Sequence, residues 1–293
     1  MQRSVVFGLL AAMTAVAIWG GNFIASRYLS SHVPPIGLAF FRWSVGFLVL
    51  APFALRPMIR QRRVIFRNFP MIALTAFLGV TSFNTLIYFA GATTAAVKMA
   101  LIAALIPALM IVSDRVLFGT PITGRKLAGL IVAFLGVAFL VSGGDPVSLL
   151  HQGFALGDLL MLGASASFAF YSTLLKYRPK ELDPNAHLGA MFLIGIMPLF
   201  PAYLWESAYV RPVVWDATTI YGIAYVGIVA SAVAYFCWNI AVRDLGSTRS
   251  AMVYYTIPLA TAFEAVLILG EAITPVHGIS FAIIIGGIVL ARK

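Results

Sequence analysis

The stretch that decides the fold is Ser231–Thr274, SAVAYFCWNIAVRDLGSTRSAMVYYTIPLATAFEAVLILGEAIT. It is decisive because a related stretch occurs earlier, at Val80–Thr123, VTSFNTLIYFAGATTAAVKMALIAALIPALMIVSDRVLFGTPIT. The two align at an offset of 151 residues, which pairs Lys98 with Arg249, Ile106-Pro107 with Ile257-Pro258, and Gly119 with Gly270. Similarity at one fixed spacing indicates a repeated structural unit.

The repeat continues upstream at a slightly different offset. At 149 residues, Arg27-Tyr28 aligns with Lys176-Tyr177, Pro35 with Pro184, and Pro52 with Pro201. We therefore predict that one unit of about 145 residues occurs twice, as residues 1–145 and residues 146–293.

The composition is that of a membrane protein. Of the 293 residues, 61% are hydrophobic and 10% are charged, and the mean hydropathy is +0.96, which leaves too little polar surface for a soluble globule. Ten apolar segments approach the roughly 20 residues that a helix needs to cross the hydrocarbon. They lie near 5–27, 36–55, 71–90, 95–117, 124–142, 156–177, 186–205, 218–241, 250–270 and 275–291. The runs are continuously apolar, which favours helices over barrel strands. We predict an all-α polytopic membrane protein.

The basic residues predict the orientation. If the N-terminus is cytoplasmic, sixteen of the 20 Lys and Arg fall on the inner side, and the outer loops hold only Arg211. The positive-inside rule then gives N-in and C-in. The net charge of +10 is explained by basic residues that set the orientation of the helices and contact the lipid bilayer. We therefore expect no nucleic-acid partner. The four histidines are scattered near segment ends, so we expect no metal site, and no motif indicates a cofactor.

Five helices per unit is an odd number, so the second unit must enter the membrane the opposite way round. This predicts two inverted-topology five-helix repeats, the architecture of secondary transporters that work by alternating access around a central cavity. The repeat alone is also compatible with a channel.

Several short motifs match a known family as a set. They are Ala17-Ile18-Trp19-Gly20-Gly21-Asn22-Phe23, Phe40-Phe41-Arg42, Gly157-Asp158, the two Ile-Pro pairs, and Leu269-Gly270-Glu271-Ala272-Ile273-Thr274. The chain resembles the EamA-type transporters of the drug/metabolite transporter superfamily over nearly its whole length. It is most similar to bacterial amino-acid exporters of the YddG type. The first repeat departs from the pattern, with Thr120 where the second has Glu271.

The resemblance implies export of aromatic and other neutral amino acids across the bacterial inner membrane by a protein that is not an enzyme. It leaves open a transporter of another small metabolite or drug on the same fold. A channel or a membrane interaction protein is the third alternative. We expect a monomer or a weak homodimer.

A zwitterionic substrate needs one group for its carboxylate and another for its ammonium. Ionisable residues inside a membrane segment usually face a cavity, which makes Arg42 and Glu264 candidates. Arg42 can bind a carboxylate with a bidentate fork. The alternative is that Arg42 ties helix ends together. Glu264 can meet the ammonium or carry a proton, or it can pair with a nearby cation or tyrosine and hold helices together.

Aromatic and amide residues extend the candidate substrate site. Aromatic walls suit an apolar side chain, and amides and hydroxyls can recognise the polar end of a substrate. The alternative is an interfacial aromatic belt or ordinary packing. The predicted residues are Trp19, Asn22, Phe83, Asn84, Tyr88, Tyr171, Tyr235, Trp238, Asn239, Tyr254 and Tyr255.

Two prolines occupy matching positions in the fourth and ninth segments. Pro107 and Pro258 each remove a backbone donor, so we expect both helices to be kinked there. Paired breaks in corresponding segments point to the binding site and its gates. We therefore predict that both prolines act as hinges.

Overall fold

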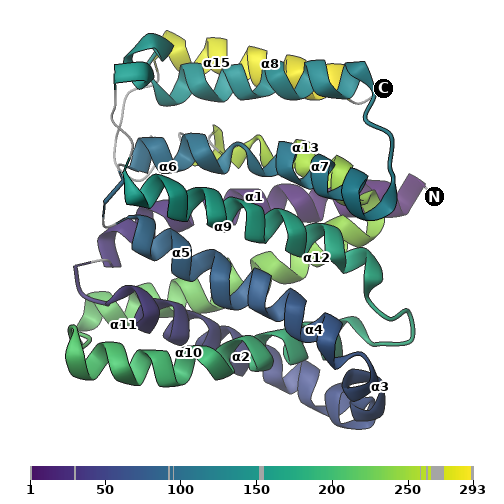
Figure 1. Ribbon diagram of the computed structural model, residues 1–293, viewed down its shortest axis with the longest axis vertical. Helices are drawn as coiled ribbons and strands as arrows, with labels where there is room; N and C mark the ends of the chain where they lie inside the picture. Colours follow the sequence, from purple (N-terminus) through teal and green to yellow (C-terminus); the bar gives the residue numbers. More distant parts are fainter. Residues whose placement is uncertain are drawn as a thin grey trace.

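The computed structural model describes residues 2–29, 31–91, 93–94, 96–151, 155–257, 259–261, 263–264 and 274–291. This part of the chain is helical and contains no strand. Figure 1 shows the helices stacked across the long axis of the molecule. The elements are α1 (Gln2–Leu29), α2 (Pro35–Arg60), α3 (Arg62–Arg67), α4 (Phe69–Ala76), η1 (Phe77–Ser82), α5 (Phe83–Ala90), α6 (Ala96–Ala103), α7 (Ile106–Phe118), α8 (Gly124–Val141), η2 (Pro146–His151), α9 (Leu156–Leu174), η3 (Leu175–Tyr177), α10 (Pro184–Tyr209), α11 (Ala217–Ala224), η4 (Tyr225–Val233), α12 (Ala234–Leu245), α13 (Ser247–Tyr254) and α15 (Pro275–Ala291).

Eight helical spans in the described residues are long and apolar enough to cross a bilayer. They are Val5–Asn22, Pro35–Arg60, Phe69–Ala90, Leu101–Phe118, Gly124–Val141, Leu156–Tyr177, Pro184–Tyr209 and Ala217–Leu245. The chain is thus an all-helical, multi-pass membrane protein. Helix α15, with 17 residues, is a shorter apolar helix. The ninth predicted segment, 250–270, falls partly outside the described residues, so the count of ten stays a prediction.

One expected connector is helical. The sequence leaves residues 56–70 as a loop, but α2 continues to Arg60 and is followed directly by α3. Four basic residues of this connector, Arg56, Arg60, Arg62 and Arg63, therefore lie in helices. Arginine is a good helix former, so a charged run past the end of an apolar segment need not end the helix.

The third segment of each repeat contains a π-helical section. In the first repeat this section, η1, ends at Ser82. In the second repeat η4 ends at Val233, which is 151 residues further on. A π-bulge changes the i→i−4 pattern and frees backbone groups for other partners. The π-helices were not expected from the sequence, which is mostly apolar at both places.

The fourth helical segment of each repeat is broken, and the two breaks lie at matching positions. The helix is interrupted at Ala104 and Leu105, immediately before Pro107, where the Ala104 N–H donates to the Leu101 carbonyl at 3.2 Å. Tyr255 and Thr256 make the same i→i−3 bonds 151 residues later. The expected kink at Pro107 is therefore present as a break in the helix. Pro258 lies outside the described residues.

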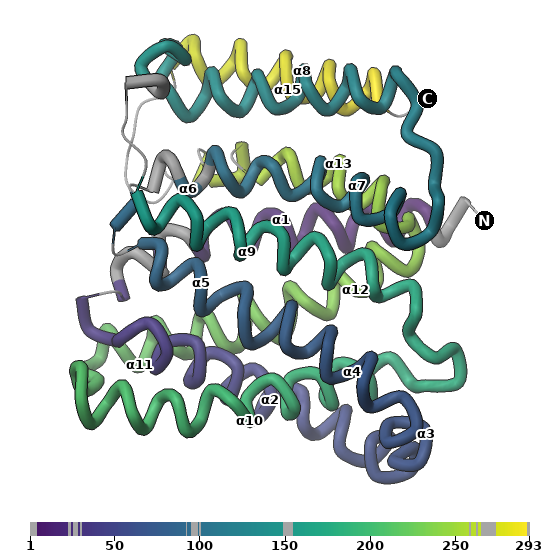
Figure 2. The backbone as a smooth tube through the Cα atoms, in the orientation of Figure 1, coloured from purple at the N-terminus to yellow at the C-terminus, as the bar shows by residue number. Residues whose placement is uncertain are grey.

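Corresponding segments pack against each other in antiparallel fashion. The start of α2 lies against the end of α10, where Gly37 approaches Tyr203, and Gly189 near the start of α10 approaches Ala54. Helices α8 and α15 form a second such pair, side by side at one edge of the molecule (Figure 2). A Cβ atom at Gly129 would lie 2.5 Å from the Ala291 Cβ, so only glycine permits this close approach.

Candidate functional site

Arg42 is the most deeply buried charge of the site and is held by three segments of the chain. It lies on α2, with 1% of its surface exposed. Its Nη1 donates to Asn22 Oδ1 on α1 at 2.8 Å and to the Tyr88 hydroxyl on α5 at 3.0 Å. Its Nε donates to Ser231 Oγ at 2.7 Å, and its Nη2 donates to the Ala230 carbonyl at 2.9 Å, both on η4.

The partners of Arg42 are all neutral. Four hydrogen bonds use four of the five guanidinium N–H groups, which leaves one Nη2 hydrogen. No described carboxylate forms an ion pair with this guanidinium. A buried charge is costly unless it is paired, so a positive charge held only by dipoles attracts an anion. Arg42 lies about two turns inside α2 and links α1, α5 and η4, so the alternative role as a structural tie stays open.

The π-helix explains how η4 reaches Arg42. The Ala230 carbonyl accepts from both Arg42 and the Trp19 indole N–H, the latter at 3.0 Å. The matching carbonyl of Gly79, on η1, accepts the Tyr235 hydroxyl at 2.7 Å. These two carbonyls are 151 residues apart and both lie in π-helical backbone, where they are free to accept side-chain donors.

A cluster of aromatic rings lies beside Arg42. Its centre is the contact between Trp19 and Phe168, whose centroids are 5.4 Å apart with the rings nearly perpendicular. An edge-to-face arrangement of this kind is favoured by the ring quadrupoles. Around these two rings lie Phe83, Tyr171, Tyr235, Trp238 and Tyr254, each within 6.4 Å of the Phe168 centroid.

The polar atoms of this cluster are bonded to one another. The Tyr171 hydroxyl donates to Asn239 Oδ1 at 2.7 Å, and the Trp238 indole N–H donates to Ser172 Oγ at 3.0 Å. Tyr171 and Asn239 are the repeat equivalents of Asn22 and Tyr88, at offsets of 149 and 151. The amide Asn22 of the first half thus aligns with a tyrosine, and the tyrosine Tyr88 aligns with an amide. Only in the first half does an arginine lie between the two side chains.

Three buried polar atoms near the cluster have no hydrogen-bond partner among the described residues: Trp43 Nε1, Asn84 Nδ2 and Glu264 Oε2. The Glu264 carboxylate packs against two glycines of α1. A Cβ atom at Gly20 would lie 2.9 Å from Oε2, and a Cβ atom at Gly21 would lie 3.2 Å from it. Buried polar groups normally find partners, so these atoms are candidates for contact with a ligand.

The structure separates one predicted residue from the others. Tyr255 packs in a second apolar cluster with α8 and α15, and its hydroxyl contacts the Leu130 carbonyl at 3.5 Å. Its neighbour Tyr254 instead touches Phe168 and Trp238. Adjacent helical residues point about 100° apart, so two consecutive tyrosines face different clusters.

The aromatic cluster is closed in this conformation. Phe168, Tyr171, Tyr235 and Trp238 have no exposed surface. A separate crevice of about 630 Å³ lies between α1, α13 and α15. Its lining is almost entirely apolar: Leu9, Met13, Val16, Ala17, Val253, Thr256, Leu259, Ala260, Phe263, His277, Phe281, Ile285 and Ile288. Within the described residues, no group of His, Cys, Asp and Glu is arranged to hold a metal ion.

Sequence reasoning missed two residues of this site and one buried acid elsewhere in the bundle. Phe168 was missed because a phenylalanine in an apolar run carries no polar signal, yet the 149-residue offset pairs it with Trp19. Ser231 was missed because its role depends on the π-helix. Asp114 is an acid inside the fourth segment, and it is buried with 2% exposure. Its charge within an apolar run was the signal that could have found it.

Comparison with known proteins agrees with this architecture. The model of the EamA-like transporter family matches twice, over residues 6–142 and residues 155–292. The chain is 28% identical over 289 residues to a "Probable terminal-alkyne amino-acid exporter" of Streptantibioticus cattleyicolor, covering 97% of this chain and 92% of the relative. It is 24% identical to a "Probable amino-acid metabolite efflux pump" of Escherichia coli, covering 94% and 92%.

Other matches also extend over most of the chain. An uncharacterised transporter of Archaeoglobus fulgidus is 27% identical, with 90% of this chain and 89% of the relative covered. A solved crystal structure, 20% identical, superposes with a TM-score of 0.76 over 97% of this chain and 96% of its own, which shows the shared fold. Since the family match extends over both halves of a chain of membrane-length apolar helices, the protein belongs to the EamA-like transporter family.

Proposed function

We propose that this transporter exports amino acids, aromatic and other neutral ones, by alternating access of two inverted repeats. The observation that carries the proposal is the buried Arg42 guanidinium, whose described partners are all neutral. A carboxylate is the anion that every amino acid brings, and a guanidinium is well suited to bind it.

The surrounding residues suggest how the rest of the substrate is bound. The free Nη2 hydrogen of Arg42 and the unpartnered Asn84 amide are two donors for a carboxylate. Trp19 and Phe168 form a wall for an aromatic side chain once the cluster opens. The unpartnered Glu264 oxygen is the acceptor for the ammonium group. Pro107 and Pro258 are the hinges, and Tyr255 is left out because it faces another cluster.

Alternating access is supported by the repeat. The two family matches fit two units, 1–145 and 146–293. The antiparallel pairing of α2 with α10 and of α8 with α15 is what inverted five-helix repeats, N-in and C-in, would give. The bacterial inner membrane and the outward direction rest on the names of bacterial relatives, which include an exporter and an efflux pump.

Counterflow in proteoliposomes tests this proposal. Vesicles loaded with an unlabelled neutral amino acid should accumulate the labelled form transiently and saturably, because an occluded site exchanges one solute for another. A screen over the common amino acids then ranks the substrates. If none exchanges, the amino-acid proposal fails, and a flux that does not saturate indicates a channel instead.

A second candidate is export of a more apolar metabolite or drug. The apolar crevice between α1, α13 and α15 favours it, because a lining of this kind accepts a solute without charged groups. Competition between such compounds and amino acids in the same exchange assay separates the two candidates.

A further inference from the structure

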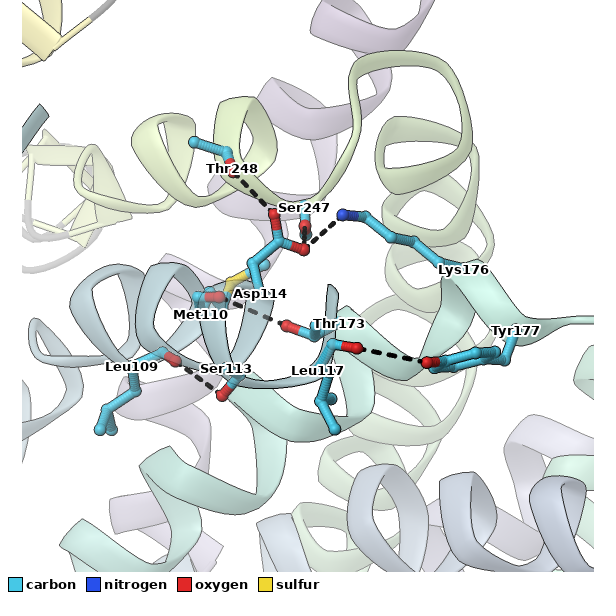
Figure 3. A network of polar contacts seen from close by, with 10 residues as sticks. All are labelled: Leu109, Met110, Ser113, Asp114, Leu117, Thr173, Lys176, Tyr177, Ser247 and Thr248. Carbon is cyan, nitrogen blue, oxygen red and sulfur yellow. Dashed lines mark hydrogen bonds and ion pairs between the residues drawn. The ribbon is translucent and has the colours of Figure 1, made fainter. Parts of the chain in front are cut away.

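A polar cluster far from Arg42 joins the two halves of the chain at one end of the bundle. Asp114, near the end of α7, forms an ion pair with Lys176 on η3. Its carboxylate also accepts the Ser247 hydroxyl at 2.9 Å and the Thr248 hydroxyl at 3.4 Å, both in the first turn of α13. Figure 3 shows these side chains converging on the carboxylate.

The cluster is well satisfied and sheltered. The Asp114 side chain is 3% exposed, and the Lys176 ammonium lies 4.4 Å from the centre of the Phe118 ring. The Asp114 carboxylate lies beside the first turn of α13, where the helix dipole favours a negative charge, and Lys176 follows the end of α9, where the dipole favours a positive one. Lys176 is 32% exposed and Asp114 is 3% exposed, so loss of the ammonium would leave a buried carboxylate without its counter-charge, which is strongly destabilising.

The partners lie on opposite sides of the repeat boundary. Asp114 belongs to the first half, and the three groups that bind it belong to the second. Any motion that parts α7 from α9 and α13 must break all three contacts. The neighbouring bond from the Thr173 hydroxyl to the Met110 carbonyl, at 3.5 Å, crosses the same boundary.

The sequence repeat keeps only the basic residue of this cluster in the other half, where Arg27 aligns with Lys176. The positions 151 residues from Ser247, Thr248 and Asp114 are Ala96, Val97 and Ala265. None of these can form an ion pair or donate a side-chain hydrogen bond. The opposite end of α9 carries a different contact between the halves, in which the Thr94 hydroxyl donates to Asp158 at 2.9 Å. The two ends thus differ in chemistry, and such a difference biases the equilibrium between the two access states.

We propose that Asp114, Lys176, Ser247 and Thr248 form a latch, and that this latch keeps the α7–α13 end of the pathway closed at rest. The inference rests on the proposed transport function, since only an alternating-access protein has an end to close. Substrate export then requires the latch to open.

Thiol labelling tests the latch without any substrate. Cys237 is the single cysteine, so the background is Cys237→Ala. Thr173→Cys places a thiol at a fully buried position one turn before Lys176. We expect slow reaction with a water-soluble maleimide in the purified protein, and a rate about tenfold or more higher after Asp114→Asn, which removes a charge-assisted contact. The control is Glu181→Gln, which breaks the exposed ion pair with Arg67 and should not alter the rate.

A cross-link gives a second readout that does not depend on weakening the fold. Asp114→Cys with Ser247→Cys, in the same background, should form a disulfide that abolishes exchange until reductant is added. Transport that continues with the disulfide formed would overturn the latch, as would an unchanged labelling rate in Asp114→Asn. If the unlinked protein transports no amino acid, the proposed function fails while the labelling result still reports on the latch.

Discussion

The substitution Arg42→Lys keeps the positive charge but removes the planar guanidinium, which can donate two parallel hydrogen bonds to a carboxylate. The guanidinium spans acceptors on three segments: Asn22, Tyr88, and Ser231 with Ala230 on η4. A lysine ammonium has three donors and acts as a point charge, so at least one of these acceptors loses its partner. Leaving a buried polar group unpaired costs about 1–3 kcal/mol of stability.

The effect on substrate binding is expected to be of similar size. A hydrogen bond to a charged group contributes about 1.5–3 kcal/mol. Losing one such bond to the substrate carboxylate should raise the Kd about 10- to 150-fold, since every 1.4 kcal/mol is tenfold. Titration calorimetry on the purified protein measures the Kd, and thermal unfolding measures the stability separately.

The matched control is Arg67→Lys, which alters an exposed arginine in an ion pair with Glu181. Exposed pairs contribute about 0–1 kcal/mol, so this variant should bind and unfold like the parent protein. If Arg42→Lys folds and binds amino acids with unchanged affinity, then Arg42 is only a structural tie and the carboxylate assignment is wrong.

Three further perturbations give distinct readouts. Gly79→Val should lower the midpoint of thermal unfolding. A Cβ at Gly79 would lie 2.6 Å from the Tyr171 ring, and such overpacking costs about 1–3 kcal/mol. An unchanged midpoint would contradict this packing. Glu264→Gln should abolish the pH dependence of exchange if this carboxyl carries a proton or meets the ammonium; an unchanged pH profile makes Glu264 structural. Asp216 caps α11, and the bond from the Thr219 N–H to its carboxylate lowers the Asp216 pKa. Its stabilisation of α11 should be present above the unfolded pKa of about 3.9 and lost as the pH falls through the lower folded pKa. Asp216→Ala should therefore speed hydrogen exchange at the start of α11 at pH 7, and its effect relative to the parent protein should shrink as the pH falls below about 3.9; an effect that does not change with pH would contradict the assignment.

Hydrophobicity predicted most of the fold. Runs of apolar residues mark spanning helices because the bilayer requires every backbone group to be bonded within its own helix. The prolines predicted where the fourth segment breaks, since Pro107 cannot donate to the preceding turn. Nothing in the local composition predicted η1 or η4, because a π-turn depends on which side chains compete for its carbonyls.

The site was predicted less completely than the fold. Trp19, Arg42 and Tyr235 were identified because polar or aromatic groups in an apolar run need partners. Their grouping depends on helix rotation, which places Tyr254 in the cluster and Tyr255 outside it. Phe168, at the centre of the cluster, is recognisable only through its repeat partner. Hydrophobic composition cannot supply such three-dimensional information.

The central claim is that this transporter recognises an amino acid by its carboxylate through Arg42. The most direct measurement compares three competitors of labelled phenylalanine exchange: unlabelled phenylalanine, its amide, and phenethylamine, which lacks the carboxylate. Phenylalanine should compete at least about tenfold better than the other two, the least that one charge-assisted hydrogen bond provides. Equal competition by all three would show that the carboxylate is not recognised and would contradict the claim.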